Sequence, residues 1–230
     1  MRHQSRVFVD ESWAALFGIE PDALWSGVTV RMHGTLGDYA GLIVAWRGEG
    51  VHVSAPASRS SEIAESLAAQ GIRDLQTAGF WSAYARSIGR NVIGPSTHQY
   101  LDEDPGMPAA VVRIEASDLH AMRQSVPAHE WEESGFDHDA QVWFGFSADG
   151  HLVAAANLSS YAGSPRVVGV LVVPDARGQR LVDEVGRAAA SYAVSRHGLA
   201  RWRARTTNRA SLGAARRLGF EPWCTQLAIR

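Results

Sequence analysis

The stretch from Arg166 to Ala193 constrains the fold of this 230-residue chain more than any other. It opens with Arg166 to Val173, a run of mostly β-branched aliphatic residues that is typical of a strand buried on both faces. Pro174 then ends the strand. Apolar residues next recur at helical spacing, at positions 181, 182, 185, 188, 189, 192 and 193. The segment therefore predicts a buried strand, a short loop and an amphipathic helix in direct succession.

The loop between this strand and this helix suits an anion. Backbone N–H groups at the start of a helix have no partner within the helix, and the helix dipole adds partial positive charge there. Arg177 and Arg180 add full charges, and Gly178 permits close backbone approach. A pyrophosphate is the natural ligand of such a place. A plain strand-to-helix turn with solvated arginines would explain the same residues, so the loop alone does not decide between the two.

The rest of the second half alternates strands and helices around this segment. Strand patterns lie at 110–114, 141–146, 151–158, 166–173, 201–205 and 220–229. Helical patterns lie at 117–122, from Leu181 to Gly198, and at 209–218. The order β-α-β-β-β-α-β-α-β predicts a mixed sheet with helices packed on it.

A loop rich in acids, proline and glycine, residues 101–108, separates the second half from the first. We therefore expect two domains, residues 1–105 and 106–230. The first half has strand patterns at 28–33, 40–47 and 51–54, a helix from Ser61 as its cap toward Gly71, and a second helix at 80–88. Residues 91–95 return as a strand or an extended loop. The polar N-terminus, residues 1–12, lacks the apolar run of a signal peptide.

Two motifs of the second half resemble those of the GNAT superfamily of N-acetyltransferases. One is the loop from Arg177 to Val182 after the fourth strand, and the other runs from Asn208 to Phe220 after the fifth. The resemblance covers residues 110–230. It implies an α/β (α+β) fold whose mixed, mostly antiparallel central sheet is flanked by helices. The first half looks like a degenerate GNAT-like copy, as in tandem-GNAT proteins, because Pro56 to Ser61 stands where its own loop would be.

The resemblance also implies a chemistry. Acetyl-coenzyme A (acetyl-CoA) would be the acetyl donor, held in a V-shaped opening between the fourth and fifth strands, and the acceptor would be a primary amine of a small molecule or peptide. The residues that it implies for cofactor binding are Leu171, Val172 and Val173 of the strand, Arg177, Gly178, Gln179, Arg180, Leu181 and Val182 of the loop, and Asn208 and Ser211 of the second motif. Asn208 also suits a helix N-cap.

Three positions depart from the family pattern. Arg180 stands where the loop usually has glycine, and we expect its side chain to crowd the pyrophosphate unless it keeps helical dihedrals and points outward. Val182 replaces a small residue. Ala215 stands where many members have a tyrosine that protonates the departing thiolate, so another group must do so. A non-catalytic acyl-CoA-binding or sensor protein therefore remains the second hypothesis, and a structural module without a ligand the third.

Candidate proton-transfer groups lie in the segment that covers the acceptor in GNAT folds. Glu132 and Glu133 are candidate general bases, although a solvated acidic face is the commoner explanation of such residues. Tyr161 and Asn157, at the end of the third strand of this half, are alternatives, and Tyr161 would equally suit a half-buried packing role. Trp131, between acids of the same segment, is a candidate for contact with substrate.

The composition of the chain limits the classes of binding partner that we expect. The formal net charge of −2 indicates neither a nucleic-acid nor a membrane partner. With the single cysteine Cys224 and no metal-ligand spacing among the histidines, we expect no metal. The longest aliphatic stretch is far too short to span a bilayer. We expect a cytoplasmic monomer or homodimer whose first half binds no cofactor, covers the sheet of the second half and helps to wall the acceptor pocket.

Overall fold

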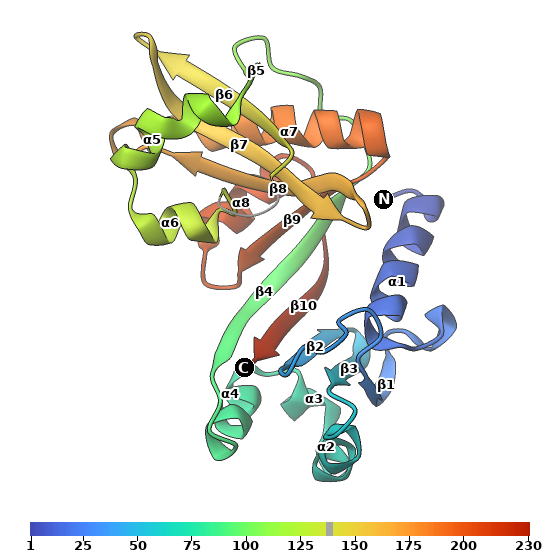
Figure 1. The fold of residues 1–230 in the computed structure, drawn as a ribbon. Helices are drawn as coiled ribbons and strands as arrows, with labels where there is room; N and C mark the ends of the chain where they lie inside the picture. The colour runs from blue at the N-terminus through green and yellow to red at the C-terminus, as the bar shows by residue number, and fades with distance from the viewer. Residues whose placement is uncertain (137–139) are drawn as a thin grey trace. The chain divides into compact units, whose positions relative to one another are not determined.

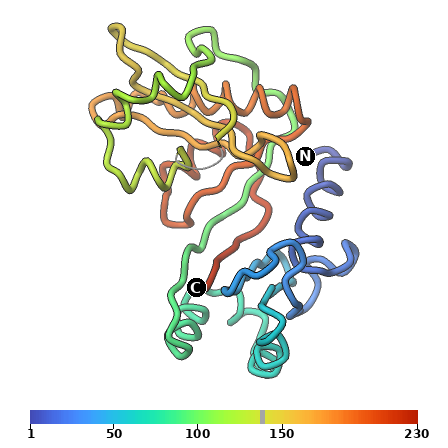
Figure 2. The backbone as a smooth tube through the Cα atoms, in the orientation of Figure 1, coloured from blue at the N-terminus to red at the C-terminus, as the bar shows by residue number. Residues whose placement is uncertain are grey.

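The computed structural model describes residues 1–136 and 140–230 (Figures 1 and 2). The chain divides into two compact units that exchange segments of sequence. Unit 1 contains residues 99–203 and 208–222 together with Met1, and unit 2 contains residues 2–98, 204–207 and 223–230. The chain thus passes between the units several times, and the domain limits 1–105 and 106–230 stay a prediction.

Unit 1 contains a sheet flanked by helices. Its strands are β5 (Val112–Ile114), β6 (Val142–Ala148), β7 (His151–Tyr161), β8 (Ser164–Val172) and β9 (Ala200–Arg205), in the order β9-β8-β7-β6-β5. Neighbours from β5 to β8 are antiparallel, whereas β8 and β9 are parallel. The helices are α5 (His120–Ser125), α6 (Ala128–Glu133), α7 (Leu181–His197) and α8 (Arg209–Arg217), with 3-10 turns η2 (Ala116–Leu119) and η3 (Pro174–Ala176). The predicted element order and the predicted mixed, mostly antiparallel class are confirmed.

Apolar side chains fix these helices to the two faces of the sheet. One cluster joins α5, α6 and the turn after α6 to β7 and β8; its buried residues are Leu119, Met122, Val126, Trp131, Phe136, Ala155 and Leu171. On α7, Tyr192 packs against Phe144 of β6 with ring centroids 5.8 Å apart, and Gly186 lies against Trp202 of β9. Because successive side chains of a strand point to opposite faces, Leu171 faces α6 while its neighbours Val170 and Val172 face α7.

Unit 2 contains the strands that are ordered β1-β3-β2-β10-β4 in the sheet. Its strands are β1 (Ser26–Met32), β2 (Leu42–Arg47), β3 (Glu49–Ala55), β4 (Val92–Leu101) and β10 (Glu221–Ile229). β1 and β3 are parallel, and β2 is antiparallel to both β3 and β10. The helices are α1 (His3–Phe17), α2 (Ser60–Leu67), α3 (Ile72–Leu75) and α4 (Ala78–Ser87), with the 3-10 turn η1 (Pro21–Ala23).

The strand β10 completes the core of unit 2. Residues 225–229 pair with residues 42–46 of β2, which places Leu227 opposite Val44. Leu227 and Ile229 are each 1% exposed and share one apolar cluster with Val44, Val53 and Trp81. The core of unit 2 therefore combines early and late parts of the sequence.

Helix α1 has no counterpart in the sequence prediction. Its buried residues Val9, Trp13 and Phe17 recur every four positions, which is the spacing of one helix face. Charged and polar residues at 10–12 separate Val9 from Trp13, whereas residues 14–16 between Trp13 and Phe17 are apolar, so the sequence of this segment shows no clear amphipathic pattern.

Two predicted boundaries in unit 2 are wrong. Strand β4 continues to Leu101 instead of ending near residue 95, so the predicted loop begins at Asp102. Helix α2 begins at Ser60 with Arg59 as its N-cap residue, so Ser61 lies inside the first turn and is not the cap. A shift of about one or two residues, as at the start of α2, is usual at element ends. The longer extension of β4 reflects its place in the sheet, where it pairs with neighbouring strands.

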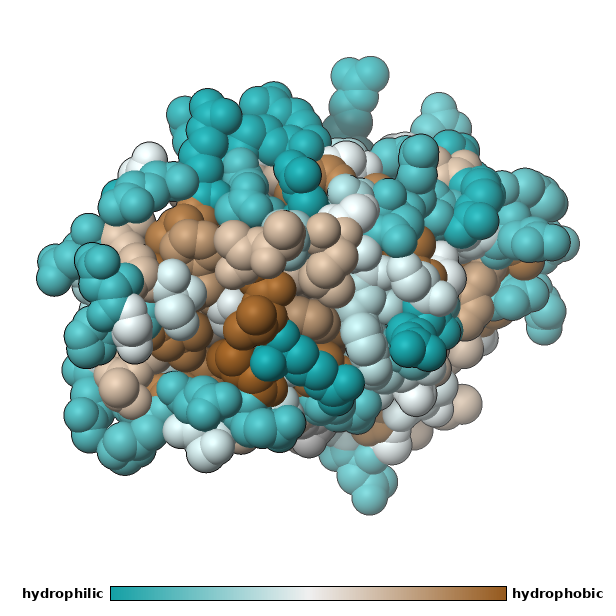
Figure 3. All heavy atoms as spheres, turned by 90° about the horizontal axis from the view of Figure 1, so that it is seen from above, coloured by the Kyte–Doolittle hydropathy of each residue, from teal (hydrophilic) through white to brown (hydrophobic). Residues whose placement is uncertain are grey.

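The visible surface is mostly polar. Figure 3 shows polar side chains surrounding a smaller apolar area on the face seen from above. In unit 1 the exposed large apolar side chains include Met107 and Val112. Within the part of the chain that the structure describes, no helix is long and apolar enough to cross a membrane.

Candidate functional site

Strands β8 and β9 separate after two residue pairs. They pair in parallel at Val167 with Arg201 and at Val168 with Trp202. Beyond Val168, no further β8–β9 pair occurs among the described residues, although the two strands are neighbours in the sheet. One edge of β8, residues 169–172, therefore lacks a strand partner. We call it the open edge, and it lies where the resemblance implies an opening for acetyl-CoA.

The β7–β8 ladder determines which residues present backbone groups at the open edge. The Val173 amide donates to the Val153 carbonyl at 2.9 Å, and these two residues lie opposite one another in the register. Hydrogen-bonded and non-hydrogen-bonded pairs alternate along an antiparallel ladder. Leu171 and Val173 therefore direct their N–H and C=O groups toward β7, whereas Val170 and Val172 direct theirs toward the open edge. Of the strand residues predicted for cofactor binding, Val172 faces the open edge, and Val170 joins it although the prediction omits it.

The loop from Pro174 to Arg180 places the start of α7 beside the end of β8. Gly178 has a φ of 83° and Arg180 a φ of 60°, both in the left-handed region that glycine adopts most easily. At the start of α7 the Asp183 amide donates to the Arg180 carbonyl at 2.8 Å. Among the described residues, the amides of Leu181 and Val182 have no backbone acceptor. They and the helix dipole make this end of α7 suitable for an anion.

Arg177 does not extend freely into solvent. Its Nε donates to the Val172 carbonyl at 3.3 Å, and its Nη2 donates to Oε2 of Glu130 in α6 at 2.5 Å. The Arg177 and Glu130 side chains are 46% and 29% exposed. The guanidinium thus joins the open edge of β8 to α6.

The side chains of the second motif hold the start of α8. Asn208 Oδ1 accepts a hydrogen bond from the Ser211 amide at 3.0 Å, which confirms the predicted N-cap. Ser211 Oγ accepts a hydrogen bond from Nε1 of Trp202 at 2.9 Å. Because Trp202 belongs to the last β8–β9 pair, these two bonds fix the start of α8 next to the point where the strands diverge.

Tyr161 lies in a cluster of aromatic rings and a cation. The Tyr100 hydroxyl donates to the Tyr161 hydroxyl at 3.4 Å, and the Arg201 guanidinium lies 4.3 Å from the centroid of the Tyr161 ring. Tyr161 is half-buried, and Arg201 pairs with β8 at the base of the open edge. Tyr100 and Arg201 were not among the predicted site residues. No local sequence pattern marks them, because β4 and β9 bring them together from distant parts of the chain.

The acids of α6 take different positions. Glu132 and Glu133 are both exposed, and Trp131 between Glu130 and Glu132 is 5% exposed within the α5–α6 cluster. Trp131 is therefore a core residue. Glu130, which the sequence analysis did not single out, is the acid of this helix that contacts the Arg177 loop.

The turn after α6 lies directly on β8. Asn157 Nδ2 donates to the Ser134 carbonyl at 3.2 Å. A Cβ added at Gly169 would come within 2.1 Å of that same carbonyl oxygen, so only glycine fits there without a shift of the backbone. Asn157 is 1% exposed and serves this contact. The segment 128–136 is thereby fixed over the middle of β8.

Comparison with known families identifies this arrangement. Residues 109–220 match the family described as Acetyltransferase (GNAT) family. Residues 109–220 form a GNAT-family domain. This domain contains the open edge, the Arg177 loop and the Asn208 motif, so the three features belong to one family fold.

Solved structures resemble the chain at low sequence identity. A Drosophila protein is 15% identical, with 87% of this chain and 77% of that chain covered and a TM-score of 0.50. A GNAT acetyltransferase from Colwellia psychrerythraea is 15% identical, with 66% and 62% covered and a TM-score of 0.46. A tandem GNAT protein from the clavulanic acid biosynthesis pathway, determined without acetyl-CoA, is 15% identical, with 99% and 95% covered and a TM-score of 0.49. At such identities the likeness concerns the fold alone.

The matched region spans less than two thirds of several related structures. It covers 62% of the Colwellia chain, 62% of a GNAT protein from Kribbella flavida and 66% of one from Novosphingobium aromaticivorans. No curated protein matches this chain.

The departures of this GNAT domain from the family pattern have different structural outcomes. Arg180 does not keep right-handed helical dihedrals: it has a left-handed backbone, and its side chain is exposed. Val182 is half-buried in the first turn of α7. Ala215 is 0% exposed within α8, so this position offers no proton donor.

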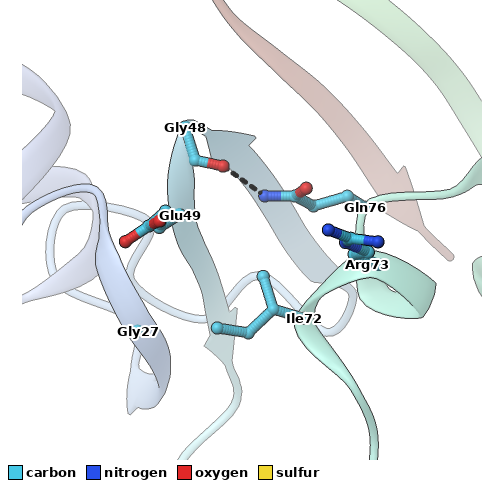
Figure 4. Close-up of a pocket in the computed structure, with 6 residues that line it drawn as sticks. All are labelled: Gly27, Gly48, Glu49, Ile72, Arg73 and Gln76. Atoms are coloured by element: carbon cyan, nitrogen blue, oxygen red, sulfur yellow. Dashed lines mark hydrogen bonds between the residues drawn. The ribbon is translucent and has the colours of Figure 1, made fainter.

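A surface depression of about 510 Å³ lies in unit 2 (Figure 4). It is lined by Gly27, Gly48, Glu49, Ile72, Arg73 and Gln76, and Gln76 Nε2 donates to the Gly48 carbonyl at 2.8 Å. It contains none of the predicted site residues, so we place the candidate site at β8 and α7. Within residues 1–136 and 140–230, no three His, Cys, Asp or Glu side chains lie close enough to hold a metal ion.

Proposed function

We propose that the chain is an N-acetyltransferase that transfers the acetyl group of acetyl-CoA to a primary amine of a small molecule or peptide. The observation that carries this proposal is the open edge of β8, which leads to the unpaired amides at the start of α7 within a GNAT-family domain. The pantetheine arm of acetyl-CoA contains amides, which can pair with an unpaired strand edge as an added strand does. Its pyrophosphate suits the amides and dipole of a helix start.

The backbone groups of this site fit the cofactor better than the side chains do. The N–H and C=O groups of Val170 and the N–H of Val172 point toward the open edge without a β9 partner among the described residues. Asn208 Oδ1 and Ser211 Oγ already hold the start of α8, so their role toward a cofactor would come through the helix position that they fix. Leu181 and Val182 contribute amides, and the exposed Arg180 contributes charge.

Bound acetyl-CoA would supply an activated thioester. In the transfer, the amine nitrogen bonds to the acetyl carbon, the carbon–sulfur bond breaks, and the departing thiolate takes up a proton to become the thiol as the amine loses one. A backbone N–H at the open edge is suited to donate to the acetyl oxygen, in the manner of an oxyanion hole. We propose Tyr161, Glu132 or Glu133 for the proton transfer, because Ala215 leaves the family's usual donor position without a hydroxyl.

The buried Ala215 also favours a second candidate function, an acyl-CoA-binding or sensor protein that does not catalyse acyl transfer. Such a protein would use the same open edge and the same loop. It differs from the enzyme only in the proton-transfer groups, so binding and turnover must be measured separately.

Isothermal titration with acetyl-CoA, followed by thiol release over a panel of amines, tests the proposal. We expect micromolar binding and thiol release with at least one amine. Binding without release for every amine would favour the sensor, and no binding would overturn both functions.

Two glycines provide a matched pair for this experiment. Gly178 has a φ of 83° and Gly163, in the β7–β8 turn, a φ of 75°, and an added Cβ meets no atom within 4 Å at either position. Both alanine variants therefore carry a similar backbone strain of about 1 kcal/mol. We expect Gly178→Ala to weaken acetyl-CoA binding because it shifts the loop amides, and Gly163→Ala to leave it unchanged. Equal affinities would place the cofactor elsewhere.

A further inference from the structure

The contact between Arg177 and Glu130 has a consequence for the order of events at the proposed acetyl-CoA site. Arg177 Nε donates to the carbonyl of Val172, and that carbonyl is one of the groups that face the open edge. The arginine side chain therefore occupies a hydrogen-bonding position on β8 that an added strand or a pantetheine amide would use. In this conformation the site is partly filled by the protein's own side chain.

Glu130 determines where that side chain lies. Its Oε2 accepts from Arg177 Nη2 at 2.5 Å, and the Glu130 side chain is 29% exposed. A charge-assisted bond of this kind is stronger than a neutral one, and partial burial reduces its screening by solvent. The guanidinium is thus held between α6 and β8 instead of reaching toward the α7 amides, where a pyrophosphate would bind.

The two ends of the α6 segment are attached differently. Its C-terminal end is fixed by the Asn157–Ser134 hydrogen bond and by the burial of Trp131 and Phe136. Its first turn is held by Glu130, which contacts the Arg177 loop, and by Val126, which is buried in the same apolar cluster just before the helix. Loss of the Glu130–Arg177 bond would therefore loosen the first turn of α6 while both flanking apolar anchors stay in place.

We propose that Glu130 and Arg177 form a strap across the open edge, and that the strap and acyl-CoA binding exclude one another. Glu130 is then a positioning residue that acts on the cofactor through Arg177. When pantetheine takes the Val172 carbonyl, Arg177 leaves both of its partners, its charge becomes available to the phosphates, and the first turn of α6 is held only by its apolar contacts. This inference rests on the proposed acyl-CoA site.

Titration of Glu130→Gln with coenzyme A tests the competition. A half-exposed ion pair contributes on the order of 0.5–1 kcal/mol, which corresponds to about 2- to 5-fold in affinity. We expect Glu130→Gln to bind coenzyme A tighter than the unmodified chain by this factor. In an Arg177→Ala background the same change should give no further gain. Unchanged or weaker binding by Glu130→Gln would overturn the competition.

Glu62→Gln is a matched control for charge. Glu62 pairs with Arg59 in unit 2 at 3.8 Å, so this change also removes one carboxylate from an arginine but leaves the open edge intact. Its coenzyme A affinity should equal that of the unmodified chain. An equal gain in both variants would show a general effect of net charge and would refute the strap.

Hydrogen exchange of residues 128–133 tests the strap without any ligand. In the free protein, Glu130→Gln should raise the exchange rate of these amides, and coenzyme A should do so in the unmodified chain but add little in the variant. Unaltered exchange in the free variant would overturn the strap even if coenzyme A binds. If the variant exchanges faster but neither protein binds coenzyme A, the strap exists, whereas the proposed function and the competition are both refuted.

Discussion

Replacing Arg180 by glycine and by alanine tests the left-handed backbone at the start of α7. Arg180 has φ 60° and ψ 21°, and its side chain is exposed. Both variants lose the same guanidinium, but only alanine keeps a Cβ, so the difference between them isolates the backbone. A left-handed residue with a Cβ costs about 1–2 kcal/mol relative to glycine. The larger entropy of glycine in the unfolded chain offsets about 0.4–1 kcal/mol of this gain.

We therefore expect the free energy of unfolding to be larger for Arg180→Gly than for Arg180→Ala by about 0.5–1 kcal/mol. For a chain of this size, that difference corresponds to a rise in Tm of about 1–4 °C. Urea denaturation followed by tryptophan fluorescence measures the free energy, and a thermal melt followed by circular dichroism measures Tm. Comparing the two variants with each other removes any contribution from the charge.

The opposite order of stability would refute the reasoning. If Arg180→Ala were as stable as Arg180→Gly or more so, the residue before α7 would not need a positive φ, and the loop would have a different shape from the one described. Acetyl-CoA titration adds a second check, because the glycine variant should keep the arrangement of the Leu181 and Val182 amides.

Three further predictions concern other residues. Gly169→Ala should lower the free energy of unfolding by about 1–3 kcal/mol in urea denaturation, because the new methyl group would displace the Ser134 carbonyl; a neutral result would contradict the close contact. Asn208→Ala should cost about 1 kcal/mol in a thermal melt through the lost N-cap, and no loss would rule out that cap in solution. Burial lowers the pKa of His52 to about 4, so the unfolded chain takes up a proton between pH 6.5 and 4 that the folded chain does not. Stability should therefore fall by up to about 3 kcal/mol as the pH drops through this window, and His52→Gln should flatten that part of the curve in denaturation experiments.

The strand-loop-helix segment of the second half could be predicted because its signals are local. A strand buried on both faces reads as a continuous aliphatic run, whereas an amphipathic helix repeats every three to four residues, so β8 and α7 differ in pattern. The same run cannot show which of its residues present backbone groups at an edge. Val170, Leu171 and Val172 are equally aliphatic, and only the hydrogen-bond register with β7 distinguishes them.

The parts that escaped prediction depend on contacts between distant residues. Glu130 and Arg177 lie 47 positions apart, and nothing in the spacing of α6 distinguishes Glu130 from Glu132. Helix α1 has only a weak apolar pattern in the sequence. In the folded chain its buried Trp13 packs against His98 of β4, with the two ring centroids 5.0 Å apart. Long-range packing of this kind overrides weak local patterns, so such elements become visible only in the folded chain.

The place of β10 in unit 2 has a consequence for synthesis on the ribosome. β2 pairs with β3 on one side and with β10 on the other, yet β10 follows β4 by more than a hundred residues of unit 1 sequence. At translation rates of about 5–20 residues per second, on the order of 10 s separates the appearance of β4 from that of β10. During this interval the nascent chain carries an incomplete sheet whose unpaired β2 edge can join the strands of other chains. Rapid release of the last strand, or a chaperone that covers β2 until then, would protect the growing chain from aggregation.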